Sequence, residues 1–515
     1  KKRLCMRNFL KLVFNRVVIV SLSILLQIIV LLAGVIWLKD YRSWINVALS
    51  VLSWATVIYI MSDRRNPSYK IAWIVLILAF PVAGITIYLL FGGNKASSRE
   101  NRKMKRISRE TLSSLPQEES VMRALMARPD AACNHARYLV NTSHYPIYDN
   151  SAAEYYHIGE DCFAQMCKDL EKAEHYIFLE YFILNEGKMW DTILEILSRK
   201  AAEGVDVRVL YDDFGCIMRL PADYPLRLRR LGIQAHAFKP FLPVLSSRLN
   251  NRDHRKLMLI DGTVGYTGGI NLADEYINIG SKFGHWKDCG VRIEGEAVWS
   301  MVVMFLTMWD YVDKLEEDLA AFRPLYGEPP ANAGGYLQPF ADSPLDYEDV
   351  GATAFSSLIQ SARERVWIMT PYLILDDKMA TALCNAAKTG VDVRIITPGI
   401  PDKRYVYIVT RANYDQLLAA GVRIFEYTPG FVHSKVCFAD GLYAVVGTVN
   451  LDFRSLYLHF ENAVYLYDCA AVGQVQRDFE DTFPRCREVT LARMRHKGFL
   501  RRLVQTILRL FSPLM

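Results

Sequence analysis

His254–Asn271 reads HRKLMLIDGTVGYTGGIN, and the same pattern returns over His433–Asn450 as HSKVCFADGLYAVVGTVN. In both copies a lysine follows the histidine by two positions, an aspartate by seven and an asparagine by seventeen. A single short His-x-Lys motif is weak evidence for a site, but two copies with identical spacing are much stronger evidence. The chain therefore contains an internal repeat, and its architecture is predicted from that repeat.

The sequence around each motif repeats as well. GVDVR at Gly204–Arg208 matches GVDVR at Gly390–Arg394. Each is preceded by a helical pattern and, before that, by an apolar run typical of a strand. These segments are Met189–Ala202 and Tyr176–Leu184 in the first copy, and Lys378–Lys388 and Val366–Leu375 in the second. We predict an α/β fold with two similar sandwich halves, residues 131–325 and 326–490, each with a mixed sheet and related by a pseudo-twofold axis.

Strands are predicted from each motif lysine onward, over residues 256–260 and 435–438. Side chains two positions apart on an extended chain lie on the same face, so the histidine and the lysine of each motif should point to one place. If the pseudo-twofold axis brings the motifs together, one site holds two imidazoles, two ammonium groups and two asparagines.

This set of side chains suits a phosphodiester. Lys256 and Lys435 can balance the charge on the nonbridging oxygens, while Asn271 and Asn450 can donate hydrogen bonds that tighten as negative charge builds. One histidine can attack phosphorus while the other protonates the leaving alcohol and later deprotonates the incoming one. We expect no metal and no cofactor.

Three apolar runs occupy the start of the chain. Val17–Leu38 is uncharged over 22 residues, long enough to cross a bilayer. Trp44–Ser62 is the second run, and Ile71–Phe91 is a third that Pro81 and Gly84 interrupt, which favours a kink or a re-entrant hairpin. The distribution of Lys and Arg predicts two spans, with the third run dipping in and returning, so that both basic ends face the cytoplasm.

Charge is divided unevenly along the chain. Residues 1–110 contain 18 Lys and Arg against four acidic residues, a net +14, and residues 491–515 add six basic residues and no acid. The whole chain carries +6, which leaves −14 for residues 111–490. Basic flanks beside apolar helices suit anionic lipid headgroups, whereas an enzyme of nucleic acids would carry its basic surface on the catalytic core. We predict anionic membrane lipid, and not nucleic acid, as the partner.

The remaining segments complete the predicted organisation. Residues 1–95 are the membrane anchor, and residues 96–130 are a basic polar tether because they show no hydrophobic periodicity. Residues 491–515 are a basic amphipathic helix, predicted to lie in the headgroup region, with docking on the protein's own core as the alternative. Ten cysteines are scattered without CxxC pairs, which favours a reducing compartment. We therefore expect a multi-pass protein of the cell membrane whose catalytic part faces the cytoplasm.

The repeated pattern His-x-Lys-x4-Asp followed by Gly-x-x-Asn resembles the HKD motif of the phospholipase D superfamily, over roughly residues 140–490. The anchor and several further stretches resemble the bacterial cardiolipin synthase branch. Examples are Arg64-Arg65-Asn66-Pro67 in a basic loop and Asn450-Leu451-Asp452-Phe453-Arg454-Ser455 at the end of the second motif. The additional run Val17–Leu38 departs from that branch.

The resemblance implies a role for each motif residue. His254 would be the nucleophile, and His433 would be the general acid and base. The family places a carboxylate behind each catalytic histidine, and Asp288 and Glu461 lie 34 and 28 residues after their motif histidines. The implied pairing is crossed, with Glu461 orienting His254 and Asp288 orienting His433.

The motif aspartates and the remaining histidines are predicted to have supporting or structural roles, with two histidines left open. Asp261 and Asp440 complete the catalytic motifs, and we expect them to support these motifs through hydrogen bonds rather than to touch substrate. His285 and His459 lie near the implied acids, and their roles stay open. The other histidines outside the motifs are predicted to be structural.

The resemblance implies phosphatidyl transfer between two phosphatidylglycerol molecules, giving cardiolipin and glycerol through a phosphohistidine intermediate. A hydrolytic phospholipase D and a phosphatidylserine synthase are alternatives that would use the same residues. A nucleic-acid phosphodiesterase is the alternative of another class, which the charge distribution disfavours. The sequence leaves a homo-oligomer open.

Overall fold

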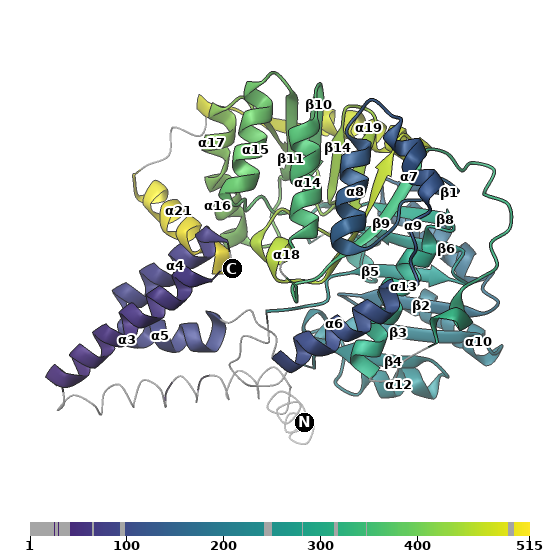
Figure 1. The fold of residues 1–515 in the computed structure, drawn as a ribbon, viewed down its shortest axis with the longest axis horizontal. Coiled ribbons are helices and arrows are strands. Elements are labelled where there is room, and N and C mark those ends of the chain that lie inside the picture. Colours follow the sequence, from purple (N-terminus) through teal and green to yellow (C-terminus); the bar gives the residue numbers. More distant parts are fainter. Residues whose placement is uncertain are drawn as a thin grey trace, which may run out of the picture.

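The computed structural model describes residues 42–63, 66–92, 98–240, 250–280, 282–313, 318–346, 348–492 and 499–514, together with positions 25 and 29. Figure 1 shows two sheet-containing halves side by side, with a group of N-terminal helices extending to one side of them. The predicted apolar run 17–38 lies outside the described residues except at those two positions.

The first half is built on a seven-stranded mixed sheet. Its strands are β1 (Ser151–Tyr156), β2 (Tyr176–Tyr181), β3 (Asp206–Asp212), β4 (Gln234–Phe238), β5 (Lys256–Ile260), β6 (Val264–Gly268) and β8 (Gly290–Gly295). The order across the sheet is β1-β8-β6-β5-β2-β3-β4, with β2, β3 and β4 parallel and the other neighbours antiparallel. Its helices are α9 (Gly159–Leu170), α10 (Lys188–Ala202), α11 (Asp213–Cys216), α12 (Tyr224–Arg230), η4 (Asp274–Ile277), α13 (Val298–Asp313) and η5 (Leu319–Phe322).

The second half repeats this topology in an eight-stranded sheet. Its strands are β9 (Tyr336–Asp342), β10 (Arg365–Met369), β11 (Asp392–Pro398), β12 (Arg423–Tyr427), β14 (Val436–Ala439), β15 (Tyr443–Gly447), β16 (Glu461–Tyr467) and β17 (Cys486–Val489). The order β9-β16-β15-β14-β10-β11-β12 matches the first sheet strand for strand, and β17 is added at the far edge. Its helices are α14 (Val350–Ser361), α15 (Asp377–Lys388), α16 (Arg404–Ala412), α17 (Tyr414–Ala419), α18 (Phe453–Tyr457), α19 (Ala470–Thr482) and η6 (Phe483–Arg485). The prediction of two tandem halves with mixed sheets is confirmed.

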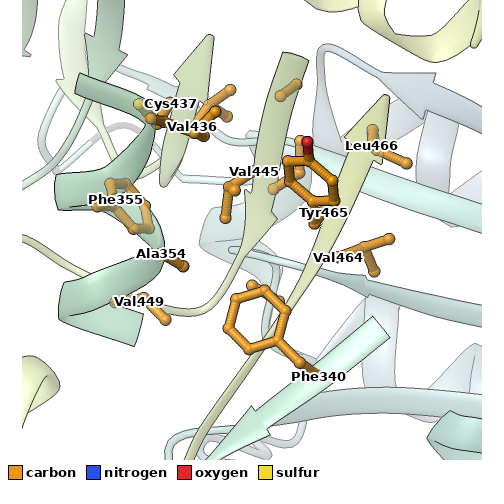
Figure 2. Close-up of a cluster of buried hydrophobic side chains, with 14 of the residues drawn as sticks. Phe340, Ala354, Phe355, Val436, Cys437, Val445, Val449, Val464, Tyr465 and Leu466 are labelled. Atoms are coloured by element: carbon orange, nitrogen blue, oxygen red, sulfur yellow. The ribbon is translucent and has the colours of Figure 1, made fainter. Parts of the chain in front are cut away.

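Apolar residues on both faces of the central strands explain why helices cover these sheets. In the second half, Phe355 of α14 packs over Val436 and Val445, and Phe340 of β9 closes the edge of the same apolar cluster (Figure 2). These side chains are buried, each contributing roughly 1.5–3 kcal/mol relative to exposure. A short two-stranded sheet of β7 (His285–Lys287) and β13 (Gly430–Val432), paired in parallel, joins the two halves beside the motifs.

The first half was predicted to begin at residue 131, but the helix that follows this position belongs with the second half. Helix α8 (Ala132–Ser143), expected in the first half, packs against α14 and β9 of the second half. Nε2 of His135 lies 3.0 Å from Oγ of Ser361 in that half. In the other direction, α19 of the second half packs against β1 of the first. A repeat in sequence marks equivalent elements, but it does not reveal which sheet a flanking helix covers.

The predicted basic polar tether, residues 96–130, is largely helical where the structure describes it. Two helices form there, α6 (Ser98–Leu112) and α7 (Glu119–Met126). Met104 and Ile107 of α6 are buried against α13, and Nζ of Lys103 donates to the carbonyl oxygen of Tyr311 at 2.6 Å. The apolar face of α6 is too narrow to stand out among its many charged residues, which is why the pattern was missed.

The N-terminal helices are α3 (Arg42–Ser62), α4 (Pro67–Ala79), α5 (Pro81–Ile87) and η2 (Tyr88–Gly92). The predicted run 71–91 is interrupted as expected, because the helix breaks at Phe80 before Pro81. The two helices then pack so closely at Gly84 that an added Cβ atom would lie 2.6 Å from the Cα atom of Ile77. Among the helices in the described ranges, none combines the length and the apolar content that a membrane crossing requires.

The C-terminal helix contacts two other parts of the protein. Helix α21 (Phe499–Phe511), followed by η7 (Ser512–Leu514), packs against α16 and α4 rather than standing free (Figure 1). Leu508 joins a cluster with Val406 and Val409, and a guanidinium nitrogen of Arg509 donates to Oε1 of Gln416 at 3.1 Å. The docked alternative is therefore the observed one. An amphipathic pattern establishes that one face is covered, but not what covers it.

Candidate active site

Both motif histidines lie just before the strands that continue the motifs, β5 and β14. The backbone N–H of His254 donates to the carbonyl oxygen of Phe460, 2.9 Å away in the second half. The backbone N–H of His433 donates to the carbonyl oxygen of Lys287, 2.7 Å away in the first half. Each motif is therefore joined by its backbone to the opposite half of the molecule.

A buried carboxylate from the opposite half contacts the Nδ1 atom of each histidine. Both carboxylate oxygens of Glu461, the first residue of β16, lie 2.9 Å from Nδ1 of His254. Oδ2 of Asp288, just after β7, lies 2.7 Å from Nδ1 of His433. A carboxylate at Nδ1 accepts the N–H there and leaves Nε2 as the reactive nitrogen. The structure thus brings together the crossed pairs that the resemblance implies, while their catalytic roles stay predictions.

Glu461 lies in a network of hydrogen-bond donors. The hydroxyl groups of Thr448 and Ser455 both donate to its carboxylate. Burial acts to raise the pKa of the Glu461 carboxyl, but the contacts with His254 and His459 hold that pKa well below its usual range. Glu461 is therefore ionised and can stabilise positive charge on the neighbouring ring.

Asp288 is also ionised, with fewer donors around it. The backbone N–H of Cys289 donates to its Oδ1 at 2.9 Å. Burial acts to raise the pKa of Asp288, but the contacts with His433 and Lys435 bring it below the usual value. The second pair thus has the same electrostatic character as the first.

Burial lowers the pKa of both motif histidines. For His254 it brings the pKa to about 3, although Glu461 opposes the shift. For His433 burial and the neighbouring Lys435 bring the pKa to about 4, with Asp288 opposing. At neutral pH both rings are uncharged in the free protein, so each keeps a lone pair on one nitrogen.

The two motif lysines are anchored in the same way. Nζ of Lys256 donates to the carbonyl oxygen of His254 at 2.6 Å, and Nζ of Lys435 donates to the carbonyl oxygen of His433. Burial lowers the pKa of Lys256 to about 7 and that of Lys435 to about 8, while the carboxylates of both halves oppose the two shifts. Because each ammonium group interacts with acids from both halves, the two motifs share one electrostatic site.

The two motif asparagines have different partners. Oδ1 of Asn271 accepts from the N–H of Ile183 at 3.1 Å, and its Nδ2 donates to the hydroxyl oxygen of Tyr276 at 2.7 Å. Asn450 is also buried, and within the described part of the chain its Oδ1 has no hydrogen-bond partner. The Asn450 side chain therefore has a free acceptor oxygen within that part of the chain, whereas both polar atoms of the Asn271 amide are already paired.

The motif aspartates lie away from the histidines. Asp261 comes five strand residues after Lys256, a distance of roughly 16 Å along the chain. Its carboxylate accepts the backbone N–H groups that begin β2, each at 2.8 Å, and Asp440 does the same at the start of β10, at 2.8–2.9 Å. Both have positive φ angles, 49° and 54°, which aspartate tolerates better than most residues. Their position suits the predicted support of the motif through hydrogen bonds.

The sequence did not reveal the rings around the two histidines. His433 contacts Tyr276 and Trp286, with ring centroids 5.4 Å from its own in both cases, and these two rings also contact each other. The centroid of His459 lies 5.5 Å from that of His254. Trp286 and His459 each stand two positions before an implied acid, and this shared spacing was the available signal. Within the described residues, His254, His459 and Glu461 are a group whose donor atoms could hold a metal ion.

Comparison with known proteins agrees with this geometry. The family model described as "Cardiolipin synthase, PLD-like domain" matches residues 166–298 and 355–483, together just over half of the chain. A second model, "Phospholipase_D-nuclease N-terminal", matches residues 48–93. The crystal structure of a phosphatidylserine synthase from Haemophilus influenzae superposes with a TM-score of 0.55 at 15% identity, covering 74% of this chain and 97% of that one. The two halves therefore have the fold of the phospholipase D superfamily.

Sequence relatives show which branch of this superfamily the chain resembles. A cardiolipin synthase of Alkalihalophilus pseudofirmus is 34% identical over 489 residues, which cover 92% of this chain and 95% of the relative. A cardiolipin synthase of Geobacillus kaustophilus is 35% identical over 476 residues, covering 90% and 93%. An uncharacterized protein of Streptococcus mutans is 42% identical over 461 residues, covering 89% and 99%.

The chain belongs to the cardiolipin synthase family, whose members are phosphatidyltransferases of the phospholipase D type. Membership of this family suggests association with a membrane.

Proposed function

We propose that this enzyme joins two phosphatidylglycerol molecules into cardiolipin and glycerol through a covalent phosphohistidine on His254. The observation that carries the proposal is the pair of buried histidines, each with a carboxylate of the opposite half at Nδ1. Two rings held in this way can take two different roles, one as the nucleophile and the other as the general acid and base.

In the first step, Nε2 of His254 attacks the phosphorus atom of one phosphatidylglycerol. The bond from phosphorus to the glycerol oxygen breaks, and protonated His433 gives its Nε2 proton to that oxygen. His433 is uncharged in the free protein, so the incoming phosphodiester anion has to raise its pKa. Asp288 favours the charged ring, and Glu461 balances the positive charge that His254 gains on attack.

In the second step, the hydroxyl group of another phosphatidylglycerol attacks the phosphorus atom of the phosphohistidine. His433, now neutral, accepts the hydroxyl proton, and the bond from phosphorus to Nε2 of His254 breaks. Glycerol and cardiolipin are the two products, and the histidines return to their starting protonation states. Lys256 and Lys435 would balance the nonbridging oxygens in both steps, with the Asn450 amide as a further donor.

The N-terminal helices support a membrane-bound substrate. Several of their large apolar residues are exposed, including Val51 at 65%, Ile58 at 66% and Leu89 at 74%. Such exposed apolar surface marks a site of interaction with another apolar surface. We propose that it contacts the bilayer in a multi-pass anchor with the catalytic halves on the cytoplasmic side.

One contact links this helical group to the catalytic region. Nδ2 of Asn66, the residue that caps α4, donates to Oδ2 of Asp376 at 2.8 Å and to the hydroxyl oxygen of Tyr457 at 3.1 Å. Tyr457 ends α18, the helix that follows the motif residue Asn450. We propose that this contact holds the active site close to the membrane surface, where a second lipid alcohol is available as acceptor.

The proposal is tested by incubating the purified full-length enzyme with labelled phosphatidylglycerol alone, in detergent and with EDTA present. We expect labelled cardiolipin and free glycerol, and a His254→Ala variant as control should form neither. Phosphatidic acid as the main product would instead identify a hydrolytic phospholipase D. Transfer only when serine and a nucleotide-activated lipid are added would identify a phosphatidylserine synthase.

A further inference from the structure

One difference between the two catalytic pairs lies two positions before the acid. The backbone contacts of the motif histidines make Phe460 equivalent to Lys287, so His459 in the second half is equivalent to Trp286 in the first. His459 therefore adds a third imidazole beside His254 and Glu461. Trp286 offers His433 an indole ring, which donates a hydrogen bond but cannot coordinate a metal.

The Nδ1 atom of His459 faces Glu461 without making a hydrogen bond to it. Its Nδ1 lies 3.7 Å from Oε1 of Glu461, too far for a good hydrogen bond. In the described portion of the chain this buried Nδ1 atom has no hydrogen-bond partner. Donor atoms of His254, His459 and Glu461 all lie within 4.8 Å of one another. Two imidazoles and a carboxylate around one point are a donor set that Zn²⁺ prefers.

We propose that His254, His459 and Glu461 form an inhibitory site for Zn²⁺ or a similar transition-metal ion. The ion binds Nδ1 of His254, Nδ1 of His459 and a carboxylate oxygen of Glu461. The proton that His254 carries on Nδ1 is displaced and taken up by Nε2 of the same ring. Since a ring nitrogen that carries a proton has no free lone pair, His254 can no longer attack phosphorus while the metal is bound.

The geometry allows this switch to be reversible. The side chains of His254 and His459 are 9% and 12% exposed, so the metal can enter from the substrate side, while Glu461 is fully buried behind them. The three residues already hold most of the required arrangement, and small movements would bring the donors to Zn²⁺ bonding distances of about 2.0–2.2 Å. A chelator that removes the ion restores the hydrogen bond between His254 and Glu461.

The metal-binding test uses the full-length enzyme in detergent, stripped with EDTA and then freed of chelator. Titration with Zn²⁺, followed by calorimetry, should show one ion bound per chain, and Co²⁺ should give the visible absorption of a four-coordinate site. His459→Asn should weaken Zn²⁺ binding at least about tenfold. His144→Asn is the matched control, because His144 is exposed and has a φ angle of 61° that asparagine adopts readily.

A second measurement follows phosphatidyl transfer with increasing Zn²⁺, and only this arm rests on the proposed function. Wild type and His144→Asn should be inhibited and recover on addition of EDTA, whereas His459→Asn should resist at least about ten times more Zn²⁺. The absence of stoichiometric Zn²⁺ binding to wild type, or equal binding and inhibition in His459→Asn, would overturn the site. If Zn²⁺ binding depends on His459 but the enzyme makes no cardiolipin, the proposed metal site stands and the proposed function is wrong.

Discussion

The first and second motifs have the same backbone but different surroundings. In both, an aspartate at positive φ accepts the N–H groups that begin the neighbouring strand, and a lysine donates to the carbonyl oxygen of its own histidine. The histidines themselves lie in unlike environments. His254 contacts Glu461, His459 and the ring of Phe182. His433 instead pairs with Asp288 and contacts the rings of Tyr276 and Trp286.

This difference indicates that the repeated part of each motif builds the scaffold, while the contributions of the opposite half assign the chemistry. Glu461 accepts hydrogen bonds from the hydroxyl groups of Thr448 and Ser455 in addition to its contact with His254. It therefore accepts more side-chain hydrogen bonds than Asp288 does. The equivalent of Thr448 is Gly269, where an added Cβ atom would lie 1.9 Å from Oδ1 of Asp288. The first half therefore has no room for the hydroxyl group that supports Glu461.

The largest effect should come from replacing the motif histidines. His254→Asn should lower cardiolipin formation by about 10⁴-fold or more, because no other group can form the covalent intermediate. His433→Asn should lower it by about 10²–10⁴-fold, the usual contribution of general acid and base. Steady-state assays with phosphatidylglycerol measure both. Full activity in purified His254→Asn would contradict the assignment.

A smaller difference should separate the two carboxylates. Glu461→Gln should lower turnover by about 10³-fold, since the amide cannot stabilise the positive charge on His254. Asp288→Asn should lower turnover of phosphatidylglycerol by about 10²-fold. It should lower turnover much less with a phosphatidyl ester of a good leaving group, because that group needs no proton to depart. Comparing the two substrates in both variants checks this. Equal rescue of Glu461→Gln by the activated ester would remove the distinction between the pairs.

The motif aspartates should affect stability rather than chemistry. Asp261→Ala leaves three backbone N–H groups without their acceptor and should lower the free energy of unfolding by about 2 kcal/mol. Asp440→Ala should lower the free energy of unfolding by a similar amount, because its carboxylate also accepts three backbone N–H groups. Thermal unfolding measures the change, with Asp261→Asn as the milder control. Turnover per folded molecule should stay within about threefold of wild type, and a much larger loss in a stably folded variant would assign the aspartates to the chemistry.

The smallest signal is proton uptake on binding of a phosphate analogue such as tungstate. At pH 6 the free enzyme has His433 unprotonated, with a pKa of about 4, while Lys256 and Lys435 are already mostly charged. A bound anion raises the pKa of His433, so about one proton should be taken up. Calorimetry in buffers of different ionisation enthalpy measures this number. His433→Asn should abolish the uptake, and an unchanged value there would assign the proton to another group.

The sequence predicted those parts of the molecule that follow from local pattern. Lys256–Ile260 is the strand it indicated, and the repeat predicted two equivalent sheets, because the spacing of the motif residues is the same in both copies. The helix α6 was missed because few of its residues are buried. The docking of α21 was only the alternative prediction, because an amphipathic pattern does not identify the covering surface. His459 was left open because its closeness to His254 depends on how the halves are joined.

The most direct test of the central claim is to find where the phosphatidyl group is attached. A phosphatidyl ester with a good leaving group is mixed with purified enzyme, the reaction is stopped in alkali to preserve phosphohistidine, and the peptides are examined by mass spectrometry. We predict an adduct on His254 in wild type and in His433→Asn, where it should accumulate, and none in His254→Asn. An adduct on His433 in the His254→Asn enzyme would contradict the account.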